Sequence, residues 1–394
     1  SLQGVQPMSK ELSRRSFIQS SAVAGLGVGL SGIGLSGCST TPRAAHVPMT
    51  APPMECVRVG FVGVGGMGSN HVRNLLRIDG VELRAVCDIV EEKVARIQGW
   101  VVEAGQPKPE GYSRGEWDFK RMCDRDDLDL VYTATPWKWH VPVCVAAMER
   151  GKHAATEVPA AVTLDECWQL VDTSEKTRRH CVMMENCCYG RSELLVLNMV
   201  RKGLFGELVH GEAGYLHDFR YGLISKTDPL PWRTIHAIER NGNLYPTHGL
   251  GPLAQCMNIN RGDRFDYLVS MSSKSRGLNL AAEKKHGADH PLAKMDYAIG
   301  DVNSSLIRTI NGVTISLIYD CSTPRPYSRI NLVQGTKGIF RGYPDRIYVE
   351  DRSPEAHTWE SPDRYFEEYE HPLWKALGDS AKGAGHGGMD FIED

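Results

Sequence analysis

Three glycines could form a loop that holds phosphate groups. Gly63, Gly65 and Gly68 have the spacing Gly-x-Gly-x-x-Gly and directly follow a short apolar run over 57–62. In such a loop the first glycine permits a tight turn, the second lets backbone N–H groups approach a pyrophosphate, and the third lets a helix pack closely on a strand. The loop therefore predicts a bound dinucleotide, contacted by Gly63, Gly65, Gly66, Met67 and Gly68.

An acidic residue lies where the ribose of such a dinucleotide would be. Asp88 ends a second strand-like run, 20 residues after Gly68. A carboxylate at this position accepts hydrogen bonds from an adenosine ribose. The same charge would repel the 2′-phosphate of NADP, so Asp88 favours NAD as the cofactor.

Strand-like and helical stretches alternate around these residues, from Val57 to Glu185. Helices are expected over 91–103, 141–150 and 164–176, and further strands over 128–133, 153–156 and 181–185. The alternation predicts an α/β fold whose N-terminal Rossmann domain, 56–185, contains a doubly wound parallel sheet. Loops at the carboxyl ends of parallel strands line the ligand site, so further cofactor contacts are expected from Trp137, Trp139, His140, Glu157 and Val158.

The pattern changes beyond about residue 190. Apolar and polar residues alternate over 206–215, 267–271, 301–310, 313–319 and 330–334, and Asn311-Gly312 is a strong signal for a hairpin turn. The substrate-binding domain, 186–394, is therefore expected to be α+β with a mostly antiparallel open sheet. We expect helices on one face of this sheet and the nucleotide on the other.

Residues 1–55 are typical of an export signal and a linker. Arg14-Arg15, followed by a weakly apolar run rich in Gly, Ser and Ala, indicates a twin-arginine (Tat) signal. Leu35-Ser-Gly-Cys38 resembles a lipobox, which would attach a lipid anchor to Cys38. Because the Tat route exports folded proteins, the cofactor would be loaded beforehand and held tightly. The expected location is the periplasm or cell envelope.

Composition and motif spacing argue against a nucleic-acid partner, disulfide bonds and a metal site. The net charge is −3 and no basic stripe is present, so nucleic acid is not an expected partner. The 11 cysteines fall singly in apolar runs, apart from Cys187-Cys188, and we expect buried free thiols. The sequence shows no Cys-x-x-Cys pair with histidine partners and no Asp/Glu/His cluster, so no metal is expected.

From Val57 to Pro159 the chain resembles the glucose-fructose oxidoreductase and inositol dehydrogenase superfamily. The resemblance rests on the glycine loop, Asp88, Thr135-Pro136 before His140, Gly151-Lys-His153 and Glu157-x-Pro159. Dehydrogenases of that superfamily carry a lysine and an aspartate where this chain has Val158 and Leu244. Valine cannot take a proton and leucine cannot hold a sugar hydroxyl, so the chemistry is expected to differ from simple alcohol oxidation.

Beyond the linker the chain resembles glycoside hydrolase family 109, the NAD-dependent alpha-N-acetylgalactosaminidases, over nearly all of its length. The matching segments are Thr156–Ala161, Glu166–Trp168, Glu185–Arg191, Asn241–Gly251 and Ser322–Ser328. One difference lies at Asp394, where the chain stops and the family continues with helices. This difference indicates a C-terminal truncation.

The resemblance implies release of terminal alpha-N-acetylgalactosamine by transient oxidation at C3, elimination and water addition at C1, and re-reduction. Imidazole has the near-neutral pKa that the proton steps require. His248 is therefore the expected base at C2 and Tyr245 an acid or orienting group, although which of the two moves the C2 proton stays open. The same resemblance places Tyr215, Arg233 and Tyr327 in the sugar pocket, and Glu157 and Asn186 near the nicotinamide ribose and carboxamide.

Two alternatives remain open at the level of sequence. A periplasmic NAD(P)-dependent sugar oxidoreductase would exchange hydride between sugars, but Val158 and Leu244 count against it. A non-catalytic sugar-binding relative would keep the nucleotide pocket without catalysis, but His248 together with Tyr245 counts against that. A homo-oligomer is expected, whereas the natural aglycone and the anomer preference are not determined by the sequence.

Overall fold

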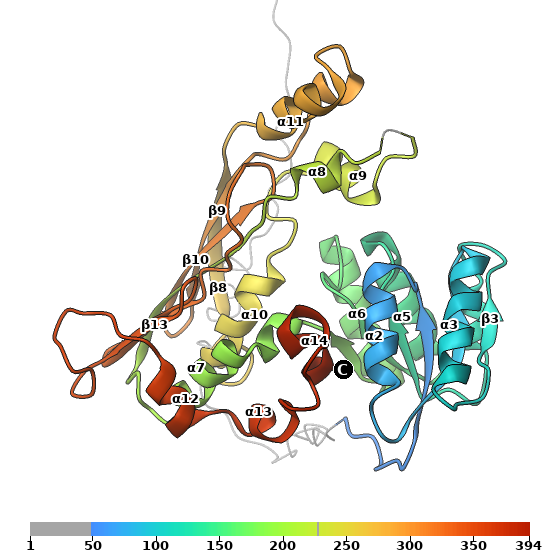
Figure 1. The fold of residues 1–394 in the computed structure, drawn as a ribbon, viewed down its shortest axis with the longest axis horizontal. Coiled ribbons are helices and arrows are strands. Elements are labelled where there is room, and N and C mark those ends of the chain that lie inside the picture. The colour runs from blue at the N-terminus through green and yellow to red at the C-terminus, as the bar shows by residue number, and fades with distance from the viewer. Residues whose placement is uncertain (1–48, 227) are drawn as a thin grey trace, which may run out of the picture. The chain divides into compact units, whose positions relative to one another are not determined.

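The computed structural model describes residues 49–226 and 228–394 (Figure 1). The twin-arginine segment around Arg14-Arg15 and the proposed lipidation site Cys38 lie outside the described residues. Within the described part, no helix is long and apolar enough to cross a membrane. The export signal and the lipid anchor therefore stay predictions.

The first sheet has six parallel strands in the order β3-β2-β1-β4-β5-β6. The strands are β1 (Val57–Val62), β2 (Val81–Cys87), β3 (Glu110–Tyr112), β4 (Leu130–Thr133), β5 (His153–Thr156) and β6 (Cys181–Met183). The strand order reverses between β1 and β4, which is the point where a doubly wound sheet binds its ligand. The predicted parallel Rossmann sheet is confirmed.

Helices cover both faces of this sheet. They are α2 (Gly66–Leu75), α3 (Glu91–Glu103), α4 (Phe119–Cys123), α5 (His140–Glu149) and α6 (Leu164–Thr177). One apolar core joins α2 and α3 to Phe61 and Leu83, and a second joins α4 and α5 to Val62 and Val131. Because successive strand residues point to opposite faces, Phe61 and Val62 belong to different cores.

The second sheet has seven strands in the order β13-β12-β11-β7-β10-β9-β8. The strands are β7 (Leu208–Leu216), β8 (Phe265–Ser272), β9 (Asn303–Thr309), β10 (Thr314–Asp320), β11 (Leu332–Gly335), β12 (Gly338–Arg341) and β13 (Arg346–Val349). Only β7 and β10 pair in parallel, so the predicted mostly antiparallel sheet is confirmed. Asn311-Gly312 forms the β9–β10 turn, where Gly312 has a positive φ of 91°.

The helices and the nucleotide cavity lie on the same face of the second sheet, whereas we expected them on opposite faces. Helices α7 (Arg191–Arg201) and α10 (Thr247–Cys256) pack on this face around Ala213 (Figure 1). Tyr215, two residues further along β7, has the same orientation and joins the cluster that contains Trp137 of the first domain. The opposite face exposes apolar side chains such as Val269 and Leu306.

Shorter elements complete the second domain. They are α8 (Arg220–Leu223), α9 (Trp232–Glu239), α11 (Gly277–His286), α12 (Asp363–Tyr369), α13 (Pro372–Leu377) and α14 (Met389–Glu393), with the 3-10 turns η1 (Trp137–Trp139), η2 (Asn186–Tyr189), η3 (Pro291–Ala293) and η4 (Gly385–Gly388). The chain returns to the first domain at its end, where Asp394 contacts His71 and Asn74 of α2.

We expect Gly68→Ala to destabilise the protein and Gly66→Ala to leave its stability nearly unchanged. A Cβ on Gly68 would collide with the Gly63 carbonyl oxygen and approach Phe61, whereas a Cβ on Gly66 meets nothing within 4 Å. Overpacking of this kind lowers the free energy of unfolding by about 1–3 kcal/mol. Urea unfolding of the two variants measures the difference, and equal losses would contradict the role assigned to Gly68.

Candidate active site

A cavity of about 880 Å³ lies at the carboxyl ends of the first sheet and is completed by the second domain. Its size is within the range of small-molecule sites. Most of the predicted residues line it, namely Gly63, Gly65, Gly66, Met67, Asp88, Trp137, Trp139, His140, Glu157, Val158, Asn186, Tyr215, Arg233, Tyr245 and His248. Gly68 and Tyr327 are not among the lining residues.

The glycine loop forms a cradle that a pyrophosphate fits. Gly65 caps helix α2, and a Cβ built on Gly65 or Gly66 meets no atom within 4 Å, so the backbone there is open to a ligand. The first turn of α2 carries no acidic side chain, which leaves the positive end of the helix free for an anion. Gly68 instead packs against Gly63, which is the packing role that its spacing predicted.

Asp88 is held rigidly at the end of β2. Its two carboxylate oxygens accept hydrogen bonds from the backbone N–H groups of Val64 and Val90, each at 3.0 Å. The side chain is 9% exposed and lines the cavity. These bonds hold the carboxylate in a fixed orientation at the cavity wall, where Lys93 Nζ lies 3.8 Å from Oδ1.

His140 holds two loops of the cavity wall together. Its Nδ1 lies 2.8 Å from the Pro159 carbonyl oxygen and its Nε2 lies 2.8 Å from the Thr135 carbonyl oxygen. Burial lowers the pKa of His140. Because both ring nitrogens face the backbone, the role of this histidine is to fix the loops after β4 and β5.

His248 and Glu185 form a buried pair at the junction of the two domains. His248 Nδ1 lies 2.7 Å from Glu185 Oε1, and the two side chains are 13% and 5% exposed. Burial alone would raise the pKa of Glu185, but the charge of His248 and its hydrogen bond lower it below the ordinary carboxyl value. The carboxylate therefore fixes the imidazole through Nδ1 and leaves Nε2 for a ligand in the cavity.

Aromatic rings surround the Arg233 guanidinium. Its central carbon lies 5.0 to 5.4 Å from the ring centres of Trp137, Phe219, Trp232 and Tyr245. Among residues 49–226 and 228–394, no carboxylate pairs with Arg233. Its N–H donors therefore remain available to a polar ligand, while the rings supply apolar surface and cation–π attraction.

Three tyrosines lie around His248 at different depths. Tyr245 is 6% exposed and its ring centre lies 4.7 Å from those of His248 and Tyr215. The Tyr215 hydroxyl is hydrogen-bonded to His217 Nδ1 at 2.8 Å. Tyr327 is 41% exposed, and its ring lies 6.2 Å from that of Tyr215, at the edge of the group rather than on the cavity wall.

Several site residues were missed from the sequence. Glu185 begins one of the segments that resemble family 109, but its role was not predicted because its hydrogen-bond partner, His248, lies 63 residues away. Phe219, Trp232 and His386 also line the cavity. An acidic residue just beyond the last parallel strand was a usable signal for Glu185, whereas no local pattern indicated His386.

The described residues contain one group of three possible metal ligands, Glu185, Cys187 and His248, with ligand atoms within 4.8 Å of one another. No local pattern indicates this group, because His248 lies 63 residues from Glu185 in the chain. The hydrogen bond between Glu185 and His248 accounts for two of the three without an ion. All ten cysteines of the described part are free thiols, and Cys187 is buried.

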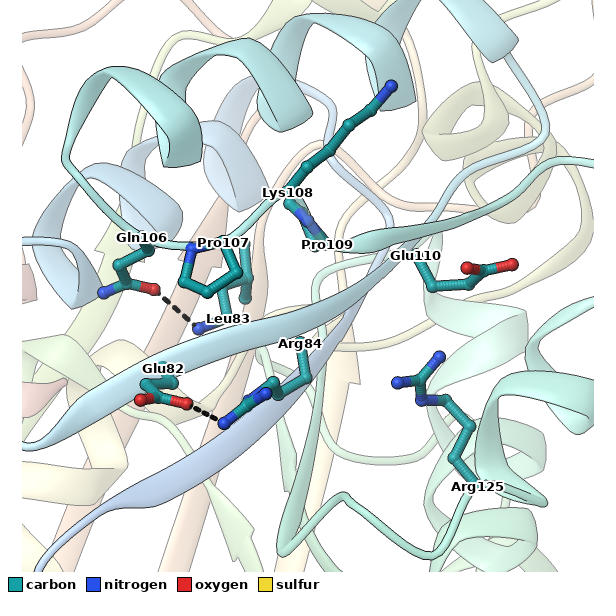
Figure 2. Close-up of a pocket in the computed structure, with 9 residues that line it drawn as sticks. All are labelled: Glu82, Leu83, Arg84, Gln106, Pro107, Lys108, Pro109, Glu110 and Arg125. Atoms are coloured by element: carbon teal, nitrogen blue, oxygen red, sulfur yellow. Dashed lines mark hydrogen bonds and ion pairs between the residues drawn. The ribbon is translucent and has the colours of Figure 1, made fainter.

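A smaller cavity, of about 130 Å³, lies beside β2 and β3 (Figure 2). Glu82 pairs with Arg84, and Gln106 accepts a hydrogen bond from the Leu83 N–H at 3.0 Å. Arg125 pairs with Asp127 at 2.6 Å. None of the predicted site residues lines this cavity, so it is not the candidate site.

The fold and the large cavity define an NAD-binding Rossmann protein with a second, sheet-containing domain. Residues 57–185 match the family described as "Oxidoreductase family, NAD-binding Rossmann fold". Residues 189–393 match "Glycosyl hydrolase 109, C-terminal domain". The chain belongs to glycosyl hydrolase family 109.

Individual relatives agree with this assignment. The chain is 48% identical over 393 residues to a family 109 protein of Shewanella pealeana, covering 97% of this chain and 86% of that protein. It is 47% identical over 390 residues to a Shewanella oneidensis protein named alpha-N-acetylgalactosaminidase, covering 96% and 85%. A levoglucosan dehydrogenase solved with NADH is 20% identical with a TM-score of 0.64, covering 86% of this chain and 87% of that chain, and shares the fold.

We expect the purified protein to retain NAD rather than NADP, because the fixed Asp88 carboxylate would repel a 2′-phosphate. Mass spectrometry of the supernatant after denaturation identifies the nucleotide. Asp88→Asn, which keeps the size and removes the charge, should reduce the preference for NAD by about ten-fold, equivalent to about 1.4 kcal/mol. Finding NADP, or no nucleotide in an active preparation, would refute this expectation.

Proposed function

We propose that this protein is a glycosidase that releases terminal alpha-N-acetylgalactosamine with the help of tightly bound NAD. The main support is the Glu185–His248 pair, whose imidazole lines the same cavity as the glycine loop and Arg233 and could serve there as a general base. The name of the Shewanella oneidensis relative supports the choice of substrate. An aryl alpha-N-acetylgalactosaminide assayed without added cofactor tests the proposal by repeated release of the phenol.

The residues of the cavity suit NAD. The glycine loop would hold the pyrophosphate, Asp88 the adenosine ribose, and Glu157 and Asn186 the nicotinamide half. When bound, NAD supplies an acceptor and donor of hydride at C3 of the sugar, so the net reaction is hydrolysis. This chemistry is an exception to the common mechanism of two paired carboxylates.

His248 would move the proton at C2. A ketone at C3 makes the neighbouring C–H bond acidic, and Nε2 of His248 is the ring nitrogen left free by Glu185. As Nε2 takes the C2 proton, the glycosidic oxygen leaves C1 with the bonding electrons. Water then adds with its oxygen at C1 and a proton at C2, and the return of hydride to C3 and of a proton to its oxygen would complete the hydrolysis.

The aromatic residues around Arg233 would bind and orient the sugar. Arg233 can donate hydrogen bonds to the acetamido oxygen or to ring hydroxyls, because its donors have no carboxylate partner among the described residues. Tyr245 and Tyr215 lie beside His248 and would orient the ring at C1 and C2. Burial raises the pKa of both tyrosines, so they stay protonated and act as donors. Tyr327 would contact the more exposed part of the substrate.

The alternatives fit the site less well. Sugar oxidoreductases of the superfamily carry a lysine and an aspartate at two positions where this chain has Val158, 3% exposed, and Leu244, both in one apolar cluster. A non-catalytic sugar-binding protein has no need of a buried carboxylate that fixes an imidazole. Only a glycosidase would release phenol over many turnovers without added cofactor.

Export and assembly are further parts of the proposal. A Tat signal would carry the protein to the periplasm or cell envelope after NAD is loaded, and Cys38 would anchor it to lipid. The exposed apolar face of the second sheet, which includes Tyr267, Val269 and Leu306, supports the expected homo-oligomer.

Replacing His248 by Ala should reduce turnover by about 10² to 10⁴, the usual scale for a positioned acid or base. NAD content should be unchanged, because the glycine loop and Asp88 are untouched. In heavy water the native enzyme should place deuterium at C2 of the released sugar. As a control, His210→Ala should keep full activity, because His210 lies on the second sheet and bonds to Thr314. Near-normal activity of His248→Ala combined with no solvent deuterium at C2 would overturn both the role and the mechanism.

Glu185→Gln should lower kcat by about 10² to 10⁴ and leave KM nearly unchanged, because Glu185 orients the imidazole and does not contact the sugar. A glutamine keeps the size but can present an N–H to Nδ1, which would place the proton on Nε2 and remove the base. Steady-state kinetics on the aryl glycoside separates the two constants. A raised KM with normal kcat would contradict the orienting role.

A further inference from the structure

His71 of α2 is buried between two carboxylates. Its Nε2 lies 2.8 Å from Glu157 Oε1, its Nδ1 lies 2.8 Å from Asp394 Oδ1, and its side chain is 0% exposed. Asn74 donates to the other oxygen of Asp394 at 2.8 Å, and Tyr132 donates to Oδ1 at 3.2 Å. His71 therefore connects the end of the described chain to Glu157, which lines the nucleotide cavity.

A second connection of the same kind begins at Asp390. Asn186 Nδ2 donates to Asp390 Oδ1 at 2.6 Å, and His386 Nδ1 lies 2.9 Å from Asp390 Oδ2. Asp390 is fully buried, whereas Asn186 and His386 line the nucleotide cavity. The segment from Gly385 to Asp394 thus contacts the cavity wall directly, through His386, and indirectly, through two buried carboxylates.

Both connections end on the same half of the nucleotide site. Asp88, at the end of β2, marks the adenosine side, and the glycine loop after β1 marks the pyrophosphate. Glu157 follows β5 and Asn186 follows β6, on the other side of the point where the strand order reverses. In an extended dinucleotide this is the nicotinamide half.

We propose that the segment from Gly385 to Asp394 belongs to the nucleotide site and orders its nicotinamide half, with Asp394 positioning Glu157 through His71 and Asp390 positioning Asn186. This inference rests on the proposed NAD dependence. His71, Asp390 and Asp394 are positioning residues, because they act on the nucleotide through Glu157 and Asn186.

The electrostatics of the cluster agree with a fixed cation between two anions. Burial alone would lower the pKa of His71, but the hydrogen bonds to Asp394 and Glu157 raise it to about 10. Burial and the charge of Glu157 raise the pKa of the nearby Glu393 to about 10, so that carboxyl group is neutral near pH 7. Glu157 is therefore held by His71 at Oε1 and by the Val158 N–H at Oε2, 2.9 Å away, and the bond to the charged histidine is the stronger of the two.

Comparing the affinities for NAD and ADP separates the positioning role from a general loss of stability. The dissociation constants of NAD and ADP would be measured by calorimetry for the nucleotide-free protein, for His71→Gln and for Asp390→Asn. ADP occupies the adenosine and pyrophosphate positions and does not reach Glu157 or Asn186. We expect each variant to bind NAD about ten-fold more weakly or worse, from the loss of a hydrogen bond to a charged group, and to bind ADP as the native protein does.

A matched control is Asp263→Asn. Asp263 is also a buried carboxylate, 6% exposed, that accepts backbone hydrogen bonds from Arg264 and Asn311 in the second domain. This variant should lower the melting temperature without changing the ratio of NAD to ADP affinity. If His71→Gln does not fold, Asp394→Asn replaces it in the comparison, because this variant removes the charge of Asp394 at constant size.

A double variant tests whether His71 acts through Glu157. Added to Glu157→Gln, the His71→Gln change should cost no further NAD affinity, because the group that it positions is already altered. Additive losses, or equal weakening of NAD and ADP, would overturn the inference and leave the proposed function intact. A native protein that binds ADP but not NAD would contradict the proposed function itself and the inference with it.

Discussion

The hydrogen bond between Glu185 and His248 joins the two halves of the molecule at the site. Glu185 follows β6, the last strand of the nucleotide sheet, and caps η2, whereas His248 lies in the first turn of α10, which packs on the substrate sheet. Two glycines of the same helix, Gly249 and Gly251, make this approach possible. A Cβ on Gly249 would lie 2.6 Å from the Gly214 backbone nitrogen, and one on Gly251 would lie 2.9 Å from Glu185 Cγ. Close packing of α10 against β7 and against the η2 turn after β6 thus sets the geometry of the imidazole.

Three buried carboxylates near the cavity each face a histidine. Glu185 faces His248, Asp390 faces His386 and Asn186, and Asp394 faces His71. An unpaired buried charge would cost several kcal/mol, whereas a paired and hydrogen-bonded one can keep a defined orientation. A protein with hydrophobic residues of similar size in place of these pairs could be equally stable. Their use here agrees with a requirement for direction and charge at the site rather than for stability alone.

The sequence predicted those features whose signals are local. The glycine loop, Asp88, the helices over 91–103 and 164–176 and the strand at 153–156 depend on short-range spacing and periodicity, and the structure shows them with nearly the same bounds. Of the residues taken from family resemblance, most line the cavity, whereas Tyr327 does not. The short strands β12 and β13 were missed because four residues carry little periodicity. The side of the second sheet that faces the nucleotide was predicted wrongly, because alternation separates the two faces but does not say which one meets the other domain.

Hydrogen-bonded pairs of residues far apart in the chain could not be predicted, because no local pattern links their members. Nothing near Glu185 indicates His248, and nothing near His71 indicates Asp394, since these contacts span 63 and 323 residues. Hydrogen-bond partners of this kind are determined by the packing of whole elements. Sequence reasoning can therefore name the groups that touch a ligand, but the residues that orient those groups require the fold.

Val158 shows how the apolar part of the site constrains its chemistry. It belongs to a buried cluster with Trp137, Tyr215, Tyr245 and Tyr319. A lysine at this position would place an ammonium group among these rings, where burial without a carboxylate partner favours the neutral form. The apolar side chain avoids that cost, and under the proposed function proton transfer would be left to His248, whose charge Glu185 can balance. Polar contact with the sugar would then come from Arg233, whose cation is stabilised by the surrounding ring faces rather than by a carboxylate that would compete with a substrate.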